Sequence, residues 1–443
     1  MTKIRHYPDG TNEDTAQQVN LYYDSYSGAG PNIAGRLAAS SNGQVAELYG
    51  YTPAGLMTMK KTSIAFPSLS VSGTLNYTYD GEGKPVSVSY PAVWTTNDQG
   101  YYVQVPGPVY DYTYDTMGRP AGMTDDGTSA TIVDQVQYGP ANELLQMRNS
   151  PPNLGTRVDT FQYNALLQLT RNTSTTDGST VLDLQYSYST TQNNGKITQS
   201  QNFLTGETVA HQYDALQRLS SAATTGPQWG LSFTYDGFGN RLSQAVTKGS
   251  APTVYSTYDA ATNRITGYTH DANGNVTRLP NGTTLTYDVE NREISANVSG
   301  SVETYIYGPD GKRVGRQSPD GKRHVFFYGA RGERIGPYLA GPYTGILQTE
   351  LVQKPLVYFG GRRLGSTVDR LGSRWYDSST TPEYFPYGEQ GATSLQDDQM
   401  FATYTRDSVT GLDYATHRYI RVWWAGSCRR IRVELRRRIQ TTL

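Results

Sequence analysis

The stretch F-T-Y-D-G-F-G-N-R-L-S-Q (233–244) contains one complete cycle of the pattern from which most of this chain is built. Its first and third residues are aromatic and share one face of an extended segment, because side chains alternate along a strand. Asp236 supplies a side-chain acceptor for a turn, and Gly237 and Gly239 tolerate the positive φ that a short hairpin loop requires. The stretch therefore predicts a strand, a tight turn and a returning strand.

The same cycle recurs along the chain. The clearest copies keep a tyrosine, an aspartate and an arginine in order: Tyr114, Asp115, Arg119; Tyr213, Asp214, Arg218; Tyr235, Asp236, Arg241; Tyr258, Asp259, Arg264; and Tyr287, Asp288, Arg292. With looser copies included, anchor tyrosines stand at 23, 51, 79, 114, 138, 163, 188, 213, 235, 258, 287, 307 and 328, about 25 residues apart on average. A repeated supersecondary unit of this length indicates a repeat architecture.

The composition fits a long, thin sheet better than a thick core. Hydrophobic residues make up 36% of the 443 residues, and Tyr (36) outnumbers Phe (10). Tyrosine, threonine and valine favour strands, while glycine and aspartate punctuate them. Because polar residues alternate with tyrosine, neither face is apolar enough for a thick packed sandwich. We expect an all-β repeat array of antiparallel hairpins that curves into a wall.

These repeats resemble the RHS/YD-repeat family over roughly residues 20 to 419. The segments D-R-L-G-S (369–373), Y-F-P-Y-G-E (384–389) and R-D-S-V-T-G-L-D-Y-A-T-H-R-Y (406–419) resemble the RHS-associated core that follows the repeats in that family. The residues that carry this second resemblance are Gly372, Tyr387, Gly388, Arg406, Asp407, Gly411, Leu412, Tyr414, Arg418 and Tyr419.

The resemblance implies a spiral sheet that forms part of a hollow shell, the β-cocoon of the family, which in intact relatives encloses a C-terminal toxin. It divides the chain into 1–20, the start of a fragment without a distinct domain; 21–360, the repeat array; 361–419, the core-like segment; and 420–443, a basic tail. The implied partners are an absent toxin cargo or the remaining shell segments. No capping unit precedes the repeats, so we expect the chain to begin inside a longer array.

The core of many family members resembles an aspartic autoprotease, but this chain lacks the two aspartates that the resemblance requires. Arg418 matches the family's arginine, whereas Ile431 stands where the first aspartate would fall. Asp407 and Asp413 could suggest a hydrolase, since paired carboxylates can activate water. A role of these two aspartates in forming a turn, with ion pairs to Arg406 and Arg418, explains their presence better. We therefore predict a protein that is not an enzyme.

No cofactor or metal is predicted, because the five histidines (6, 211, 270, 324 and 417) lack ligand spacing. The repeat arginines, 119, 218, 241, 264, 292, 313 and 334, could form a stripe for anionic ligands, but we expect them to pair with the aspartates of their own or neighbouring turns. The alternative function is a cell-surface module that binds carbohydrate through exposed rows of tyrosine and arginine.

The sequence shows no pattern of a membrane span or of a secretory signal peptide. No apolar run is long enough to span a membrane, and Met1 to Ala16 has no hydrophobic region of a signal peptide.

The 420–443 tail is rich in arginine, which could favour nucleic acid. Its abrupt change of composition instead favours a shifted reading frame and disorder, so no nucleic-acid partner is predicted. Tyr90–Pro108 and Gly329–Leu356 are expected to be loops, and 14–21 and 392–402 to be short helices.

Overall fold

The computed structural model describes residues 1–7, 12–151, 155–343, 345–349, 355–375, 384–390, 397–416 and 418–420. The expectations for the tail from 421 onward, including Ile431, and for His417 lie outside the described residues. Within the described residues the fold is nearly all β, as predicted, and the helical turns are the short 3-10 elements η1 (Thr15–Gln17) and η2 (Phe401–Thr403). No helix in this part of the chain has the length and apolarity to cross a membrane.

The hairpin predicted from residues 233–244 is present. β20 (Trp229–Tyr235) pairs with β21 (Arg241–Gly249) in antiparallel register, with Tyr235 opposite Arg241. The carboxylate of Asp236 accepts the backbone N–H groups of Phe238 and Asn240, both at 2.9 Å. Gly239 has φ of +85°, whereas Gly237 is not in the positive-φ region, so only one of the two predicted glycines is needed for the turn.

Twenty strands form the first sheet, and each strand pairs antiparallel with the next strand of the sheet along the chain. They are β1 (Thr2–Ile4), β2 (Val19–Tyr23), β3 (Leu37–Ser41), β4 (Val45–Tyr51), β5 (Met57–Phe66), β6 (Leu69–Tyr79), β7 (Pro85–Ser89), β10 (Val109–Tyr114), β11 (Pro120–Asp125), β12 (Ala130–Tyr138), β13 (Leu144–Asn149), β14 (Arg157–Tyr163), β15 (Leu169–Thr176), β16 (Ser179–Tyr188), β17 (Ile197–Asn202), β18 (Thr208–Tyr213), β19 (Leu219–Thr224), β20, β21 and β22 (Val254–Tyr255).

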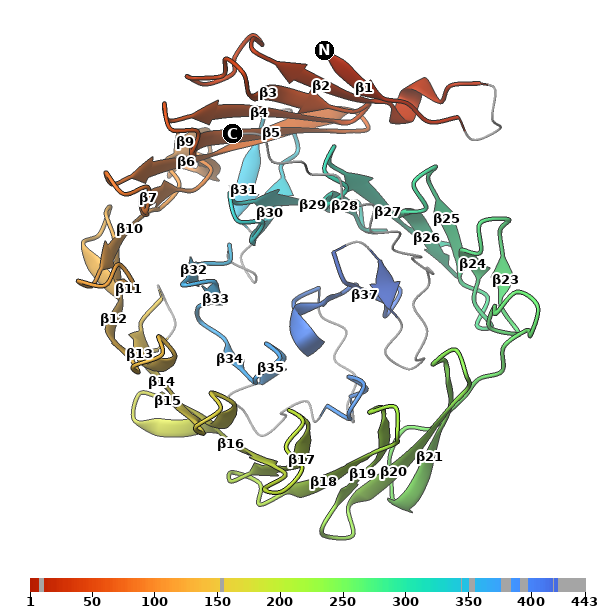
Figure 1. Ribbon diagram of the computed structural model, residues 1–443. Coiled ribbons are helices and arrows are strands. Elements are labelled where there is room, and N and C mark those ends of the chain that lie inside the picture. The colour runs from red at the N-terminus through yellow and green to blue at the C-terminus, as the bar shows by residue number, and fades with distance from the viewer. Residues whose placement is uncertain are drawn as a thin grey trace.

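Nine strands continue the array as a second antiparallel sheet. They are β23 (Thr269–His270), β24 (Val276–Arg278), β25 (Thr284–Tyr287), β26 (Glu293–Val298), β27 (Ser301–Tyr307), β28 (Arg313–Gln317), β29 (Arg323–Tyr328), β30 (Arg334–Ala340) and β31 (Leu347–Thr349). Together the two sheets run once around a ring, and the end of the second sheet passes inside the start of the first (Figure 1). The array is therefore a spiral.

The overlap of the spiral contains a two-layer core. Phe327 of β29 lies against Gly73 of β6, so closely that a Cβ on the glycine would be 2.4 Å from the phenylalanine Cζ. Val71, Ile306 and Val325 belong to the same buried cluster. The expectation that no thick packed core forms is therefore wrong at this overlap, because two turns of the spiral supply apolar faces that a single wall lacks.

The described residues between 355 and 420, which we call the inner segment, lie within the ring (Figure 1). Their short elements are β32 (Tyr358–Phe359), β33 (Arg362–Arg363), β34 (Thr367–Val368), β35 (Arg374–Trp375), η2, β36 (Thr405–Arg406), β37 (Asp413–Tyr414) and β38 (Tyr419–Ile420). The described part of the segment that resembles the RHS-associated core thus lies inside the wall.

Two expected loops and one expected helix are wrong. Tyr90–Pro108 contains the hairpin of β8 (Val93–Thr96) and β9 (Tyr102–Val105), and Gly329–Leu356 contains β30 and β31. Residues 14–21 hold η1 and the start of β2 in place of a helix. At 392–402, η2 provides a 3-10 turn from Phe401, and residues 392–396 lie outside the described part of the chain.

Candidate functional site

The repeat tyrosines join each hairpin to the one before it. The Tyr213 hydroxyl donates to the Ile197 carbonyl at 2.9 Å, and the Tyr235 hydroxyl donates to the Leu219 carbonyl at 2.7 Å. The same bond to a preceding hairpin is made by Tyr51, Tyr79, Tyr114, Tyr138, Tyr188, Tyr287, Tyr307, Tyr328 and Tyr358. Tyr358 was not among the predicted anchors, although it continues their order along the chain.

One class of repeat arginine pairs within its own turn, as predicted. Arg119 binds Asp115 at 2.7 Å and Arg218 binds Asp214 at 2.7 Å, while Arg292 binds Asp288 at 2.6 Å. Each of these arginines stands five residues after its anchor tyrosine and also covers the ring of the next anchor tyrosine. Arg264 stands six residues after Tyr258, but its turn is one residue longer, because Ile265 and not Arg264 lies opposite that tyrosine. Its described hydrogen bond goes to the Ala272 carbonyl at 3.0 Å and not to an aspartate, so the predicted pairing is not found for Arg264 among the described residues.

A second class of arginine lies directly opposite its anchor tyrosine, six residues after it, and is buried. Its members are Arg241, Arg313 and Arg334, each opposite its anchor tyrosine at the start of a returning strand. The prediction that repeat arginines pair with turn aspartates is wrong for Arg241 and Arg313, because a shift of one position turns the side chain toward the inner segment. It is also wrong for Arg334, whose guanidinium has no hydrogen-bond partner among the described residues.

Arg313 makes the densest contacts between the wall and the inner segment. Its guanidinium binds Asp407 through Nη1 at 2.5 Å and Nη2 at 2.9 Å, and it donates to the Tyr419 hydroxyl at 2.7 Å. The Tyr414 hydroxyl accepts the backbone N–H of Arg313 at 2.8 Å, and the Tyr414 ring lies 4.3 Å from the guanidinium carbon. Arg313 and Asp407 side chains are 1% and 0% exposed, so this ion pair is fully withdrawn from water.

Arg241, in β21 of the first sheet, forms a second anchor to the inner segment. It binds the Glu389 carboxylate at 3.1 Å, with the two side chains 1% and 0% exposed. The Tyr387 ring lies 4.3 Å from the guanidinium carbon and edge-on to Phe233 at 5.3 Å. Buried ion pairs from both sheets of the wall therefore hold the inner segment, and Arg316 adds a further one to Asp407 at 3.6 Å.

The remaining core-motif residues shape the inner segment. Arg406 binds Asp413 at 2.8 and 3.0 Å. The expected pairing of Arg418 with Asp407 or Asp413 is wrong, because these acids bind Arg313 and Arg406, and Arg418 is exposed.

The three motif glycines have positive φ at tight turns: Gly372 (+78°), Gly388 (+90°) and Gly411 (+67°). Leu412 is fully buried in a cluster with Tyr305, Tyr307, Tyr414 and Tyr419.

Two buried glutamates near this junction were not predicted. Burial, with the charge of Asp407, raises the pKa of Glu293 well above its usual range, and neither of its side-chain oxygens has a hydrogen-bond partner among the described residues. Burial also raises the pKa of Glu303 to about 8. The repeat spacing could have indicated that Glu293 is buried, because it stands six residues after Tyr287, at the same repeat position as the buried arginines.

The two aspartates of the junction are held in ion pairs. Asp407 and Asp413 are each engaged by a guanidinium, so they do not form the free carboxylate pair that would activate water. Among the described residues no group of three or more His, Cys, Asp and Glu side chains could hold a metal ion. His211 and His324 instead lie beside Ser200 and Arg316, both at 3.1 Å.

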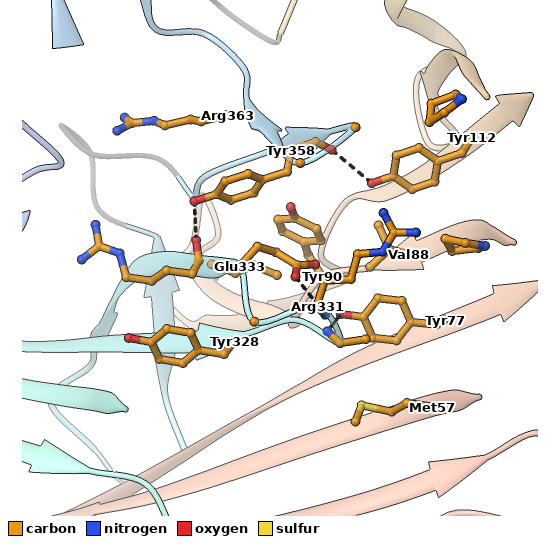
Figure 2. Close-up of a pocket in the computed structure, with 18 of the residues that line it drawn as sticks. Met57, Tyr77, Val88, Tyr90, Tyr112, Tyr328, Arg331, Glu333, Tyr358 and Arg363 are labelled. Carbon is orange, nitrogen blue, oxygen red and sulfur yellow. Dashed lines mark hydrogen bonds between the residues drawn. The ribbon is translucent and has the colours of Figure 1, made fainter. Parts of the chain in front are cut away.

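A pocket of about 760 Å³ lies between the wall and the inner segment. Figure 2 shows tyrosines of both layers around it, including Tyr77, Tyr112, Tyr328 and Tyr358. The Tyr112 hydroxyl donates to the Tyr358 carbonyl at 3.3 Å, which ties the two layers together at this point. Arg334 also lines this pocket.

Comparisons with known proteins agree with this architecture. Residues 152–335 match a family model described as Teneurin YD-shell. The chain is similar to the Photorhabdus luminescens Tc holotoxin pore, with 16% identity and a TM-score of 0.69 over 96% of this chain and 24% of that chain. It is similar to the complex TcdB2-TccC3-Cdc42, with 15% identity and a TM-score of 0.70 over 96% of this chain and 25% of that chain.

No curated protein matches the sequence. The chain spans about a quarter of the length of the solved chains it resembles. The predicted resemblance to an RHS/YD-repeat shell and its all-β fold are confirmed.

Proposed function

We propose that this chain is a part of a shell that encloses a polypeptide, and that it acts by containment and has no catalytic activity of its own. The observation that carries the proposal is the pair of buried anchors, Arg313 with Asp407 and Arg241 with Glu389, which fix the inner segment within the ring. An inner segment held at both anchors supports a role in closing the array and defining the enclosed space. The likeness to the Tc holotoxin structures supports the shell architecture.

The predicted division of the chain is retained within this proposal. We assign the wall to 21–360, with 1–20 as its start, and the closing segment to 361–419. The partners would be the remaining parts of the shell and an enclosed chain, of which a toxin is the class suggested by the relatives' printed names.

Carbohydrate binding by rows of tyrosine stays a prediction, and the geometry gives it little support. The anchor tyrosines donate their hydroxyls to backbone carbonyls, and basic side chains cover several of their rings, as Arg218 covers Tyr235 at 4.7 Å. Ring faces already covered in this way are poorly available to a sugar.

Protease protection tests the proposal. A flexible reporter peptide is fused after Leu443 in one protein and before Met1 in another, and both are digested under native conditions. Enclosure predicts that the reporter after Leu443 is cut at least tenfold more slowly. Equal cutting rates would contradict enclosure by this chain. The variant Asp407→Asn, which loosens the inner segment, should shorten the protection if the anchor contributes to it.

A further inference from the structure

Arg334 occupies the same repeat position as Arg241 and Arg313, but no described residue provides the carboxylate partner that they have. Each of those two arginines, six residues after its anchor tyrosine, binds a buried carboxylate of the inner segment. Arg334 stands six residues after Tyr328 and is 8% exposed. Within the described residues, its Nε, Nη1 and Nη2 atoms have no hydrogen-bond partner.

The two described acids near Arg334, Glu333 and Asp398, are already engaged. The Glu333 carboxylate turns back to its own hairpin and accepts the backbone N–H of Arg331 at 3.1 Å. Asp398 binds Arg363 at 3.1 Å and also binds Arg374. The described contact of the Arg334 guanidinium is with the ring of Phe326, 5.0 Å away.

An isolated buried cation is unfavourable, because it loses its hydration without gaining a counter-charge. Burial accordingly lowers the pKa of Arg334. A guanidinium that keeps its planar set of N–H donors unused is suited to a carboxylate, which can accept two parallel hydrogen bonds from it.

The space beside Arg334 can accommodate such a group. Arg334 lines the pocket of about 760 Å³, together with Tyr328 and Tyr358. The hydroxyls of these two tyrosines donate to the carbonyls of Arg313 and Arg334, so their rings are fixed in position. The pocket thus combines a fixed aromatic lining with a buried cation that has no hydrogen-bond partner among the described residues.

We propose that Arg334 is a binding site for a carboxylate presented by a ligand that enters this pocket. The carboxylate can belong to an acidic side chain of a polypeptide or to a free small acid, and both would reproduce the contact that Glu389 and Asp407 make at the equivalent arginines. This inference goes beyond containment, since it assigns a specific chemical contact on the inner side of the wall.

Thermal unfolding of the full chain tests the site. The added ligands are acetate, glutarate and a blocked short peptide with one glutamate, each titrated at constant ionic strength against chloride. We expect a saturable rise of the unfolding midpoint with carboxylate, because a ligand that binds only the folded state stabilises it. The same peptide with glutamine in place of glutamate should give no rise. A tighter response to the glutamate peptide assigns the site to polypeptides, and an equal response to acetate or glutarate assigns it to free acids.

Two variants connect the response to Arg334. Arg334→Met should lower the carboxylate affinity at least tenfold, and Arg334→Lys, which keeps the charge but not the planar donors, should lower it by less. Arg278→Gln, at an exposed arginine outside the pocket, should bind as wild type does. No saturable response of wild type to any of the carboxylates, or an unchanged affinity in both Arg334 variants, would overturn the proposal. Because no cargo takes part in this measurement, its failure is separate from a failure of the enclosure test.

Discussion

Arg313 and Asp407 stand 94 residues apart in the sequence, yet Nη2 of the arginine lies 2.9 Å from Oδ1 of the aspartate. Both side chains are buried from solvent. The arginine opens a strand of the wall, and the aspartate precedes a turn of the inner segment. One contact thus links the local repeat to the long-range arrangement of the shell.

Removing Asp407 should destabilise the protein strongly. Asp407→Ala leaves the Arg313 guanidinium buried without its counter-charge, and such changes cost about 3–5 kcal/mol. The measurement is the free energy of unfolding in urea. Asp134→Ala, which breaks the partly exposed pair with Arg148, should cost less than about 1 kcal/mol.

The double variant Arg313→Met with Asp407→Leu separates the ion pair from simple packing. Because it removes both charges together, it should be more stable than Asp407→Ala. If Asp407→Ala costs no more than Asp134→Ala, then this ion pair does not hold the inner segment.

The tyrosine hydroxyls should each contribute a measurable amount to stability. Tyr213→Phe removes the donor to the Ile197 carbonyl, a bond of 2.9 Å, and keeps the ring. Loss of one such bond costs about 0.5–1.5 kcal/mol in the free energy of unfolding. Tyr255→Phe is the matched control, since Tyr255 is 67% exposed and should change stability by less than about 0.5 kcal/mol. Equal effects of the two changes would show that the repeated bond is not a stabilising feature.

Local spacing was enough to predict the repeats, because the tyrosine, aspartate and glycine of one cycle act within a dozen residues. Asp236 and Gly239 illustrate this. The hairpin within Tyr90–Pro108 could have been found in the same way, since Asn97 accepts the N–H groups of Gln99 and Tyr101 as a repeat aspartate does.

The buried anchors could not be predicted from spacing alone. Arg292 and Arg313 each follow a turn, and one residue of difference in position sends the first to its own aspartate and the second to Asp407. Which repeats face the inner segment depends on how the spiral closes, and that is set by contacts such as Phe327 against Gly73 that no local pattern contains.

Stability should fall as pH rises through the range in which Glu303 loses its proton. Burial and the charge of Asp407 raise the pKa of Glu303 from 4.5 to about 8, while Arg316, 3.7 Å away, acts in the other direction but is also bound to Asp397. The folded protein therefore binds a proton that the unfolded chain has released above about pH 4.5. Its contribution to stability is complete below that pH and is lost as pH rises toward about 8.

Glu303→Gln tests this dependence. The variant keeps a neutral side chain at every pH, so its free energy of unfolding should fall less steeply than that of wild type between about pH 4.5 and 8. Glu82→Gln, at a side chain that is 78% exposed, should retain the wild-type profile. Parallel profiles of wild type and Glu303→Gln would contradict the assignment.

The overlap of the two spiral turns should not tolerate a side chain at position 73. Gly73→Ala places a methyl group 2.4 Å from the Phe327 ring, and overpacking of this kind costs about 1–3 kcal/mol. Phe327→Leu in the same protein should relieve the clash, so the two changes together should cost less than the sum of each alone. Gly81→Ala, where the new atom meets open space, is the control for the loss of glycine itself. Strictly additive effects at 73 and 327 would show that the layers do not pack as described.

Alanine should destabilise the hairpin at 233–244 when it replaces Gly239 but not when it replaces Gly237. Gly239 has φ of +85° and open space where a methyl group would lie, so Gly239→Ala introduces only the backbone penalty of the left-handed region, about 1–2 kcal/mol. Gly237 also faces open space but lies outside the positive-φ region, so Gly237→Ala should be neutral or should stabilise by about 0.4–1 kcal/mol through a more restricted unfolded chain. Urea unfolding of both variants provides the comparison. The two substitutions are chemically identical and lie two residues apart. A larger loss of stability from Gly237→Ala than from Gly239→Ala would mean that Gly237, and not Gly239, has the positive φ in this turn.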